Sequence, residues 1–270
     1  MSSLNITGRG RGALGGFAAL ALLLWAAAAL AQVNLPDSPV RVYQVRMQEP
    51  AEGSLKLSSE VERVKEIRNR LYRTVQAGQP VYIFEREDRT DDGDQISWSF
   101  TLSPDRLGLL RVEKKIRSHS GQQVVDSWYD YRDPMFSFPK NTCFLYTIVP
   151  ALEAMRLEPG AQNDIYVLLS LDQTPWHMFV VVEARETITV PAGTFPCLRV
   201  RLEPDYKQIM GRWSWAASVV KPLVPDYIFW VEEAPPHYLI RFEGKYGPVG
   251  ATPTQTHELT AILPPPGGSL

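Results

Sequence analysis

The chain has 270 residues, of which 28 are basic and 30 are acidic, and its formal net charge at pH 7 is −2. This balance, without a lysine-rich run, argues against a nucleic-acid partner. The only cysteines are Cys143 and Cys197, which excludes both a disulfide-dense scaffold and a C-x-x-C redox motif. The length suits a single domain with a sizeable core.

Residues 1–31 have the features of a signal peptide. Arg9 and Arg11 precede a long apolar run, and Ala29-Leu30-Ala31 places small residues at the two positions that signal peptidase reads. We therefore expect the export machinery to release a periplasmic or secreted bacterial protein that begins at Gln32. An uncleaved membrane anchor is the alternative, because the apolar run is long enough to span a bilayer.

The remainder divides into a lead-in segment at 32–57, a single β-rich domain at 58–263 and a disordered tail at 264–270. The domain opens with a predicted helix over 59–77. Ser59 and Glu62 form a capping box there, apolar residues recur on one stripe, and a glycine ends the pattern.

Period-two alternation then predicts antiparallel strands connected as a meander. The expected strands are 40–45, 81–87, 96–102, 107–116, 124–131, 165–171, 177–190, 195–203, 227–233, 237–244 and 257–263. Pro191-Ala192-Gly193 suits a hairpin turn, because proline presets φ and glycine can adopt a left-handed conformation. The acidic stretch 88–94 is interpreted as a solvated hairpin turn.

Two segments interrupt the strands. A short helix is expected over 144–156 with an interruption at Pro150, and residues 205–222 are compatible with either a helical excursion or a long loop. The predicted fold class is therefore mainly β (α+β). A curved antiparallel meander would form an incomplete barrel, covered by the N-terminal helix and the shorter central helix.

Three strand segments, IYVLLSL, MFVVV and YIFWV, are apolar at consecutive positions, which indicates that both of their faces are covered. The cover is either the two helices or an apolar ligand between the sheet and the helices. For the second case, the candidate wall of the cavity consists of Trp98, Phe100, Tyr166, Leu168, Phe179, Val181 and Phe229.

Export makes oxidation the expected fate of a cysteine pair, so Cys143 and Cys197 are predicted to form a disulfide. The alternative is a free thiol with redox or nucleophilic chemistry.

Motifs for catalysis are missing from the sequence. It contains no G-x-S-x-G, no H-E-x-x-H, no Gly-rich phosphate loop and no C-x-x-C-H haem site, so no cofactor or metal is expected. The histidines, which are His119, His177, His237 and His257, occur singly near strand ends and are expected at loop ends or on the surface. The chain is therefore expected not to be an enzyme, with a hydrolase of unrecognised site as the alternative.

The segments ETITVPAGTFPCLRVRLEP and FWVEEAPPHYLIRFEG resemble an uncharacterised family of secreted bacterial proteins, a domain of unknown function with a VPAGTF hairpin. The order of elements is also similar to that of the lipoprotein carriers LolA and LolB, whose incomplete barrel is plugged by helices and holds acyl chains. The second resemblance implies a periplasmic, non-enzymatic protein that binds an apolar or amphipathic molecule such as a lipid or a lipoprotein acyl chain. The alternative is a structural or assembly factor of the cell envelope, with envelope proteins as partners and no small-molecule ligand.

Overall fold

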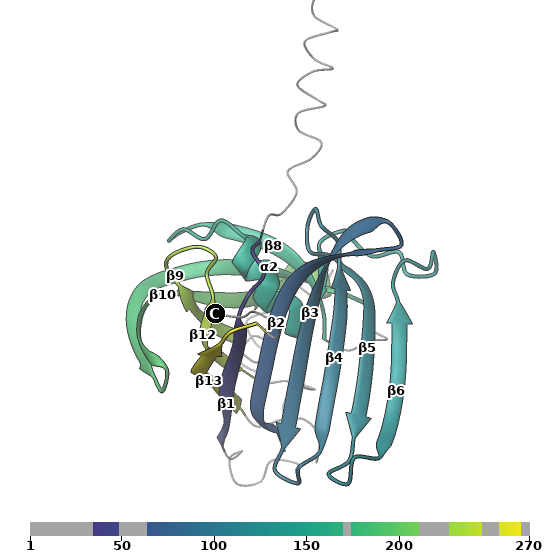
Figure 1. Cartoon of the computed structure of the whole chain (residues 1–270). Helices are drawn as coiled ribbons and strands as arrows, with labels where there is room; N and C mark the ends of the chain where they lie inside the picture. Colours follow the sequence, from purple (N-terminus) through teal and green to yellow (C-terminus); the bar gives the residue numbers. More distant parts are fainter. Residues whose placement is uncertain (1–34, 49–63, 170–173, 211–226, 245–253, 266–270) are drawn as a thin grey trace, which may run out of the picture. The chain divides into compact units, whose positions relative to one another are not determined.

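The computed structural model describes residues 35–48, 64–169, 174–210, 227–244 and 254–265. Within these ranges the chain forms a 13-stranded sheet in the order β6-β5-β4-β3-β2-β1-β13-β12-β11-β10-β9-β8-β7 (Figure 1). The strands are β1 (Val40–Gln48), β2 (Val64–Gln76), β3 (Gln79–Thr90), β4 (Gln95–Leu102), β5 (Leu109–Arg117), β6 (Gln123–Asp130), β7 (Thr142–Phe144), β8 (Gln162–Leu168), β9 (Trp176–Val190), β10 (Gly193–Pro204), β11 (Tyr227–Glu232), β12 (Leu239–Gly244) and β13 (Thr254–Leu263). Neighbouring strands are antiparallel, except that β7 and β8 are parallel.

The sheet is curved but not closed. Residues of β5 and β7, which lie near opposite ends of the strand order, come within 8 Å of one another between Cα atoms. Strand pairing does not bridge this gap within the described part of the chain. The predicted fold class, a mainly β protein built on a curved antiparallel meander, is therefore confirmed.

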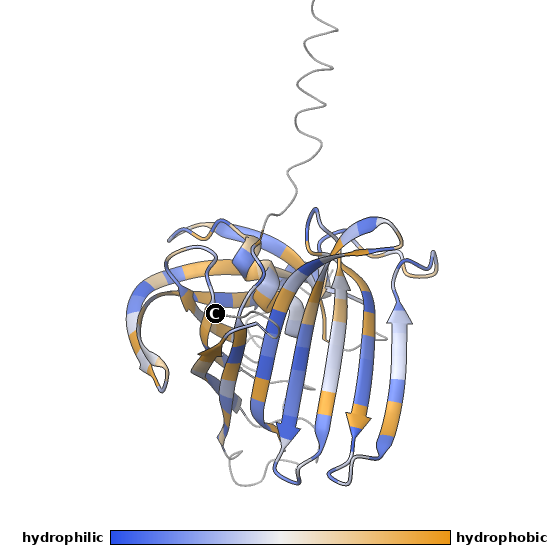
Figure 2. Ribbon diagram, viewed as in Figure 1, coloured by the Kyte–Doolittle hydropathy of each residue, from blue (hydrophilic) through white to orange (hydrophobic). Residues whose placement is uncertain are grey.

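One face of the sheet, called the inner face below, is buried, and the opposite face is the outer face. On β4, Ile96, Trp98 and Phe100 are buried, while Ser97 and Ser99 between them are partly exposed. Figure 2 shows the same alternation of apolar and polar residues along the neighbouring strands. The period of two therefore assigns one set of side chains to the core and the other to solvent.

A short 3₁₀ turn, η2 (Leu145–Thr147), and the helix α2 (Ile148–Ala154) follow β7 and pack on the inner face. The Tyr146 ring lies 5.4 Å from that of Trp98, and the Phe144 ring lies 5.7 Å from that of Phe100, between ring centroids. The predicted central helix is thus present. Pro150 does not interrupt it, because this residue lies in the first turn, where an N–H has no intrahelical partner.

The predicted helix over 59–77 is wrong for the residues that the structure describes. Residues 64–76 form β2, which pairs with β1 and β3. Asn69 occupies a buried position between Ile67 and Leu71, so a polar residue hides the period-two pattern in the sequence. Val75, expected on the buried stripe of a helix, has 66% of its surface exposed. Pairing with two neighbouring strands has overridden the local helical pattern.

Other expectations concern segments next to the sheet. β1, which was predicted within the lead-in segment, lies in the middle of the sheet between β2 and β13. The predicted hairpin joins β9 to β10, where Val190 pairs with Gly193 and the glycine has a φ of +141°. Asp88 was expected in a solvated turn but lies on β3, where 2% of its surface is exposed.

The helix α3 (Tyr206–Met210) starts the ambiguous segment at 205–222, and the part of this segment from residue 211 onward lies outside the described residues. The predicted leader, most of the predicted tail and the first turn of the predicted N-terminal helix lie outside them as well. Among the residues that are described, none belongs to a helix long and apolar enough to cross a membrane.

The predicted disulfide is wrong. Cys143 and Cys197 are both free and buried. Cys143 lies on β7 and Cys197 on β10, and β8 and β9 separate these strands in the sheet. Three strand spacings amount to about 14 Å, whereas a disulfide needs Cα atoms within about 7 Å. The strand order, which the sequence does not show, keeps the two thiols apart.

Candidate functional site

Five inner-face residues form a polar row that runs across the sheet. In the strand register, Arg41 of β1 lies opposite Asn69 of β2, and Asn69 lies opposite Arg86 of β3. Arg86 in turn lies opposite Trp98 of β4, and Trp98 lies opposite Lys114 of β5. The first four residues are buried, with exposed fractions between 1% and 9%, and Lys114 is partly buried. Buried arginines that share one row are unusual, because burial removes their water shell.

The rows on either side of the polar row are largely apolar. One neighbouring row consists of Leu71, Phe84, Phe100 and Val112. The other consists of Tyr43, Ile67, Asp88, Ile96 and Ile116. The inner face therefore presents a narrow polar band between largely apolar rows.

Arg41 is the most deeply buried cation of the row. Its Nη1 donates a hydrogen bond to Glu153 Oε1 of α2, and its guanidinium carbon lies 4.6 Å from the centre of the Tyr238 ring. Its Nε and Nη2 have no hydrogen-bond partner within the part of the chain that the structure describes, and neither has Asn69 Oδ1 on the neighbouring strand. Burial raises the pKa of the Glu153 carboxyl, and the charge of Arg41 offsets part of the increase.

A second buried ion pair lies farther along the row. Arg86 Nε donates to Asp88 Oδ1 at 2.7 Å, and the guanidinium carbon lies 4.0 Å from the centre of the Tyr146 ring in η2. Burial raises the pKa of Asp88, and Arg86 counteracts this increase. Lys114 Nζ lies 4.9 Å from the centre of the Trp98 ring. The η2–α2 segment thus contacts the row at both Arg41 and Arg86.

The histidines were expected at loop ends or on the surface, and only His119 is exposed. His257 and His237 are buried, with exposed fractions of 3% and 6%. His177 is partly buried, and its Nδ1 lies 3.0 Å from Asp205 Oδ2 while its Nε2 lies 3.6 Å from Asp164 Oδ2. In the described ranges, no cluster of histidine, cysteine and acidic residues has an arrangement that could hold a metal ion.

The predicted cavity wall does not form one surface. Trp98, Phe100, Leu168 and Phe229 are buried in the hydrophobic core. Phe179 and Val181 are partly exposed and alternate along β9 with buried residues, so they belong to the outer face. Tyr166, whose ring lies 4.9 Å from that of His177, is also partly exposed. The residues named on β4 are thus buried ones, whereas those named on β9 lie one position away from the buried ones.

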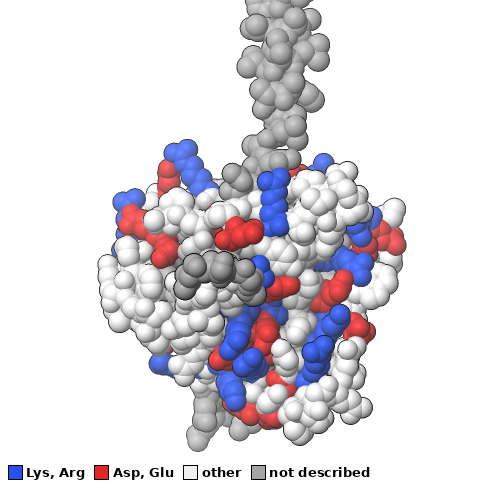
Figure 3. All heavy atoms as spheres, in the orientation of Figure 1, with Lys and Arg blue, Asp and Glu red and all other residues white. Residues whose placement is uncertain are grey.

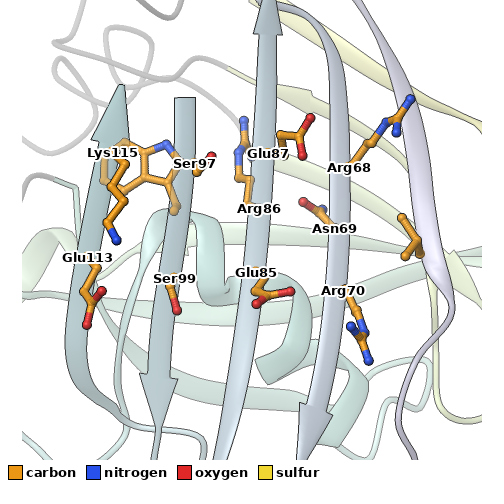
Figure 4. A pocket seen from close by; sticks show the side chains of 12 residues that line it. Arg68, Asn69, Arg70, Glu85, Arg86, Glu87, Ser97, Ser99, Glu113 and Lys115 are labelled. Carbon is orange, nitrogen blue, oxygen red and sulfur yellow. The ribbon is translucent and has the colours of Figure 1, made fainter. Parts of the chain in front are cut away.

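A hollow of about 400 Å³ lies on the outer face of β2–β5, and its lining also includes Asn69, Arg86 and Trp98 of the polar row (Figure 4). Ser97 and Ser99 form its floor because their side chains are short, and Figure 4 shows them between the charged residues of β3 and β5. Glu85 accepts a hydrogen bond from Tyr72, and Glu87 pairs with Arg89. Lys, Arg, Asp and Glu side chains intermingle over this face (Figure 3). The hollow is open to solvent and its acids have partners, so it is a solvated charged surface.

A smaller hollow of about 290 Å³ lies at the ends of β4–β6, next to the start of β7. Its lining includes Leu109, Tyr131, Phe136 and Phe138. The three rings contact one another, with centroids 5.0 to 5.7 Å apart. We call it the aromatic hollow. Its lining is mixed, because Ser103, Asp105, Lys140 and Thr142 lie beside the rings, and it lies close to the gap between β5 and β7.

The polar row was not predicted from the sequence, although a signal for it is present. Arg41 has the same parity as Tyr43 and Val45 on β1, and Arg86 has the same parity as Phe84 on β3. A charged residue in phase with buried apolar residues marks an inner-face position. The row itself appears only when the register of five strands is known.

These features define a class: a curved, open, β-barrel-like sheet with a polar row on its inner face. No protein-family model matches the chain, and no curated protein matches it either. Among solved structures, it is similar to the beta-barrel-like protein of domain of unknown function DUF1849 from Brucella abortus. The two are 11% identical with a TM-score of 0.46, and the match covers 86% of this chain and 100% of that chain.

Proposed function

We propose that this protein is an exported, non-enzymatic binding protein whose inner face takes up an apolar or amphipathic molecule, such as a lipid or the acyl chain of a lipoprotein. The ligand would lie between the sheet and the η2–α2 segment and would separate their side chains, since Tyr146 packs on Trp98 and Phe144 packs on Phe100 in this structure. It would contact the apolar rows with its chain and the polar row with its head.

The observation that carries this proposal is the composition of the inner face. A face that served only as a core would favour apolar residues, because a buried arginine with unpaired N–H groups destabilises the fold. Here the Nε and Nη2 of Arg41 have no acceptor within the described residues, although only 1% of Arg41 is exposed. Buried polar groups without partners are rare in folded proteins and call for an explanation, which we assign here to a bound ligand.

The apolar part of the ligand has a sufficient driving force. Burial of a methylene group contributes about 0.8 kcal/mol, so a chain of about ten methylenes outweighs moderate association costs. The aromatic hollow, which lies near the gap between β5 and β7, provides three aromatic rings where such a chain could begin to enter.

The first test is made on the full chain purified under native conditions. Extraction with organic solvent should release a co-purifying amphiphile, and the extracted protein should bind a fluorescent fatty acid saturably. Adjacent residues of β6 provide matched variants, since Ser127 is half-buried on the inner face and Asp126 is exposed on the outer face. Ser127→Trp should weaken the binding by at least tenfold, and Asp126→Trp should leave it unchanged. No extract and no saturable binding would refute the proposal.

A second candidate function is that of an envelope assembly factor without a small ligand. It rests on β6, an end strand of the sheet on which Val124 and Trp128 have 63% and 60% of their surface exposed. Unprotected end strands pair readily with other chains. Under this alternative, Asp126→Pro would abolish capture of an envelope partner, and the inner face would bind no fatty acid.

A further inference from the structure

We infer that the polar row recognises an oxyanion headgroup, a carboxylate or a phosphate monoester on an acyl chain, through the Nε and Nη2 of Arg41. This inference rests on the proposed function and specifies the chemistry of its ligand. It concerns the headgroup of the ligand, whereas the proposed function depends on the apolar chain of the ligand.

The geometry of the guanidinium is the first reason. Glu153 accepts a hydrogen bond from Nη1, and Nε and Nη2 on the other side have no acceptor in the described part of the chain. Nε–H and Nη2–H point in parallel, and this side of a guanidinium matches the two oxygens of a carboxylate or phosphate. Glu153 thus does not occupy the side that is suited to bidentate recognition, and Arg41 also donates a hydrogen bond to the Tyr43 side chain.

The residue opposite Arg41 extends the site. Asn69 is 4% exposed, and its Oδ1 has no donor within the described residues. The carboxamide can accept a hydrogen bond from a hydroxyl of the headgroup or, when turned over, donate its NH₂ to the oxyanion. Arg41 and Asn69 together therefore offer both donors and an acceptor at one point of the inner face.

The surroundings explain why the ligand should be an amphiphile. Leu71 of β2 and Tyr43 of β1 belong to the apolar rows on either side of Arg41 and Asn69. Both side chains are buried, with exposed fractions of 0% and 1%, so a ligand that reaches Arg41 must pass between apolar core residues. A headgroup carried on an apolar chain suits such a passage better than a free inorganic ion, which must give up its whole water shell.

Glu153 lowers the affinity of this site. Its carboxylate binds the same guanidinium that would receive the headgroup, so the two anions repel each other across Arg41. Glu153→Gln preserves the size of the side chain and removes the competing charge. This variant should therefore bind an anionic amphiphile more tightly than the unmodified protein does.

The experiment measures the affinity of the full chain for dodecyl phosphate below its critical micelle concentration, for dodecanol below its solubility limit, and for inorganic phosphate. Dodecyl phosphate should bind at least tenfold more tightly than dodecanol, because a charge-assisted bidentate pair is added. Glu153→Gln should raise the affinity for dodecyl phosphate several-fold and leave that for dodecanol unchanged. Arg41→Lys should abolish the preference for dodecyl phosphate. Arg46→Gln on the exposed side of β1 is the control and should change nothing.

Equal affinities for dodecyl phosphate and dodecanol would overturn this inference and leave the proposed function standing. Binding of neither amphiphile would overturn both. Inorganic phosphate binding as tightly as dodecyl phosphate would also overturn the inference, because the acyl chain would then contribute nothing. The comparison of the three probes on the unmodified protein decides the matter even if Arg41→Lys fails to fold, which circular dichroism would show.

Discussion

Arg41 and Glu153 are 112 positions apart in the sequence and form a buried ion pair that joins β1 to α2. The side chains are 1% and 2% exposed. The pair attaches the helix to the inner face at the same point where the polar row begins. The position of α2 therefore affects whether the Arg41 guanidinium is available to bind a ligand.

Substitution of Arg41 alone should lower the unfolding free energy more than substitution of Arg41 and Glu153 together. Arg41→Met leaves the Glu153 carboxylate buried without its cation, which should cost about 3–5 kcal/mol of unfolding free energy. Arg41→Met combined with Glu153→Leu should recover most of this loss, because an apolar pair of similar volume carries no desolvation penalty. Urea unfolding of both variants measures the difference. Arg46→Met is the matched control on β1, since Arg46 is 60% exposed and should contribute less than about 1 kcal/mol. A double variant as unstable as Arg41→Met would contradict this account.

The regular strands were the most predictable part of the fold. Ile96, Trp98 and Phe100 alternate with small polar residues on β4, and local sequence is enough to show which face is buried. β2 was not predictable in this way because Asn69 breaks its apolar alternation. Asn69 lies in the polar row between Arg41 and Arg86, which belong to the neighbouring strands. The polar row and the separation of the two cysteines both depend on strand order, which is a property of the complete sheet.

The thiols should be protected in the folded protein. Burial raises the pKa of Cys143 to about 12, and burial together with Glu232 and Glu186 raises the pKa of Cys197 to about 12. Because the thiolate is the reactive form, a thiol reagent at pH 8 should react slowly or not at all with the native protein. In denaturant it should count two free thiols. One reactive thiol in the native state, or none after unfolding without reductant, would contradict the structure.

His257 should make the stability depend on pH. Burial, and to a smaller extent the charge of Arg86, holds the pKa of His257 well below its usual 6.5. Below pH 6.5 His257 is therefore protonated in the unfolded chain but not in the folded chain. The unfolding free energy falls as the pH falls. The loss approaches about 1.4 kcal/mol per pH unit for this one group.

His257→Gln removes the titrating group and keeps a partner for Gln255, which lies 3.1 Å from His257 Nε2. Chemical unfolding at pH 7.5, 6.5 and 5.5 should show a shallower decline for this variant than for the unmodified protein. His119→Gln, at an exposed position, is the control for the substitution itself. Identical slopes for His257→Gln and the unmodified protein would show that His257 titrates normally in the folded state.

The most direct test of the central claim locates the bound molecule. A fatty acid with a diazirine near the end of its chain is mixed with the full-length protein, irradiated and mapped by mass spectrometry of the peptides. The account predicts adducts in residues 142–155 and 96–102, which contact each other on the inner face, and their suppression by excess unlabelled fatty acid. Adducts confined to exposed residues such as Val124, Trp128 and Met135, or labelling that unlabelled fatty acid does not suppress, would contradict it.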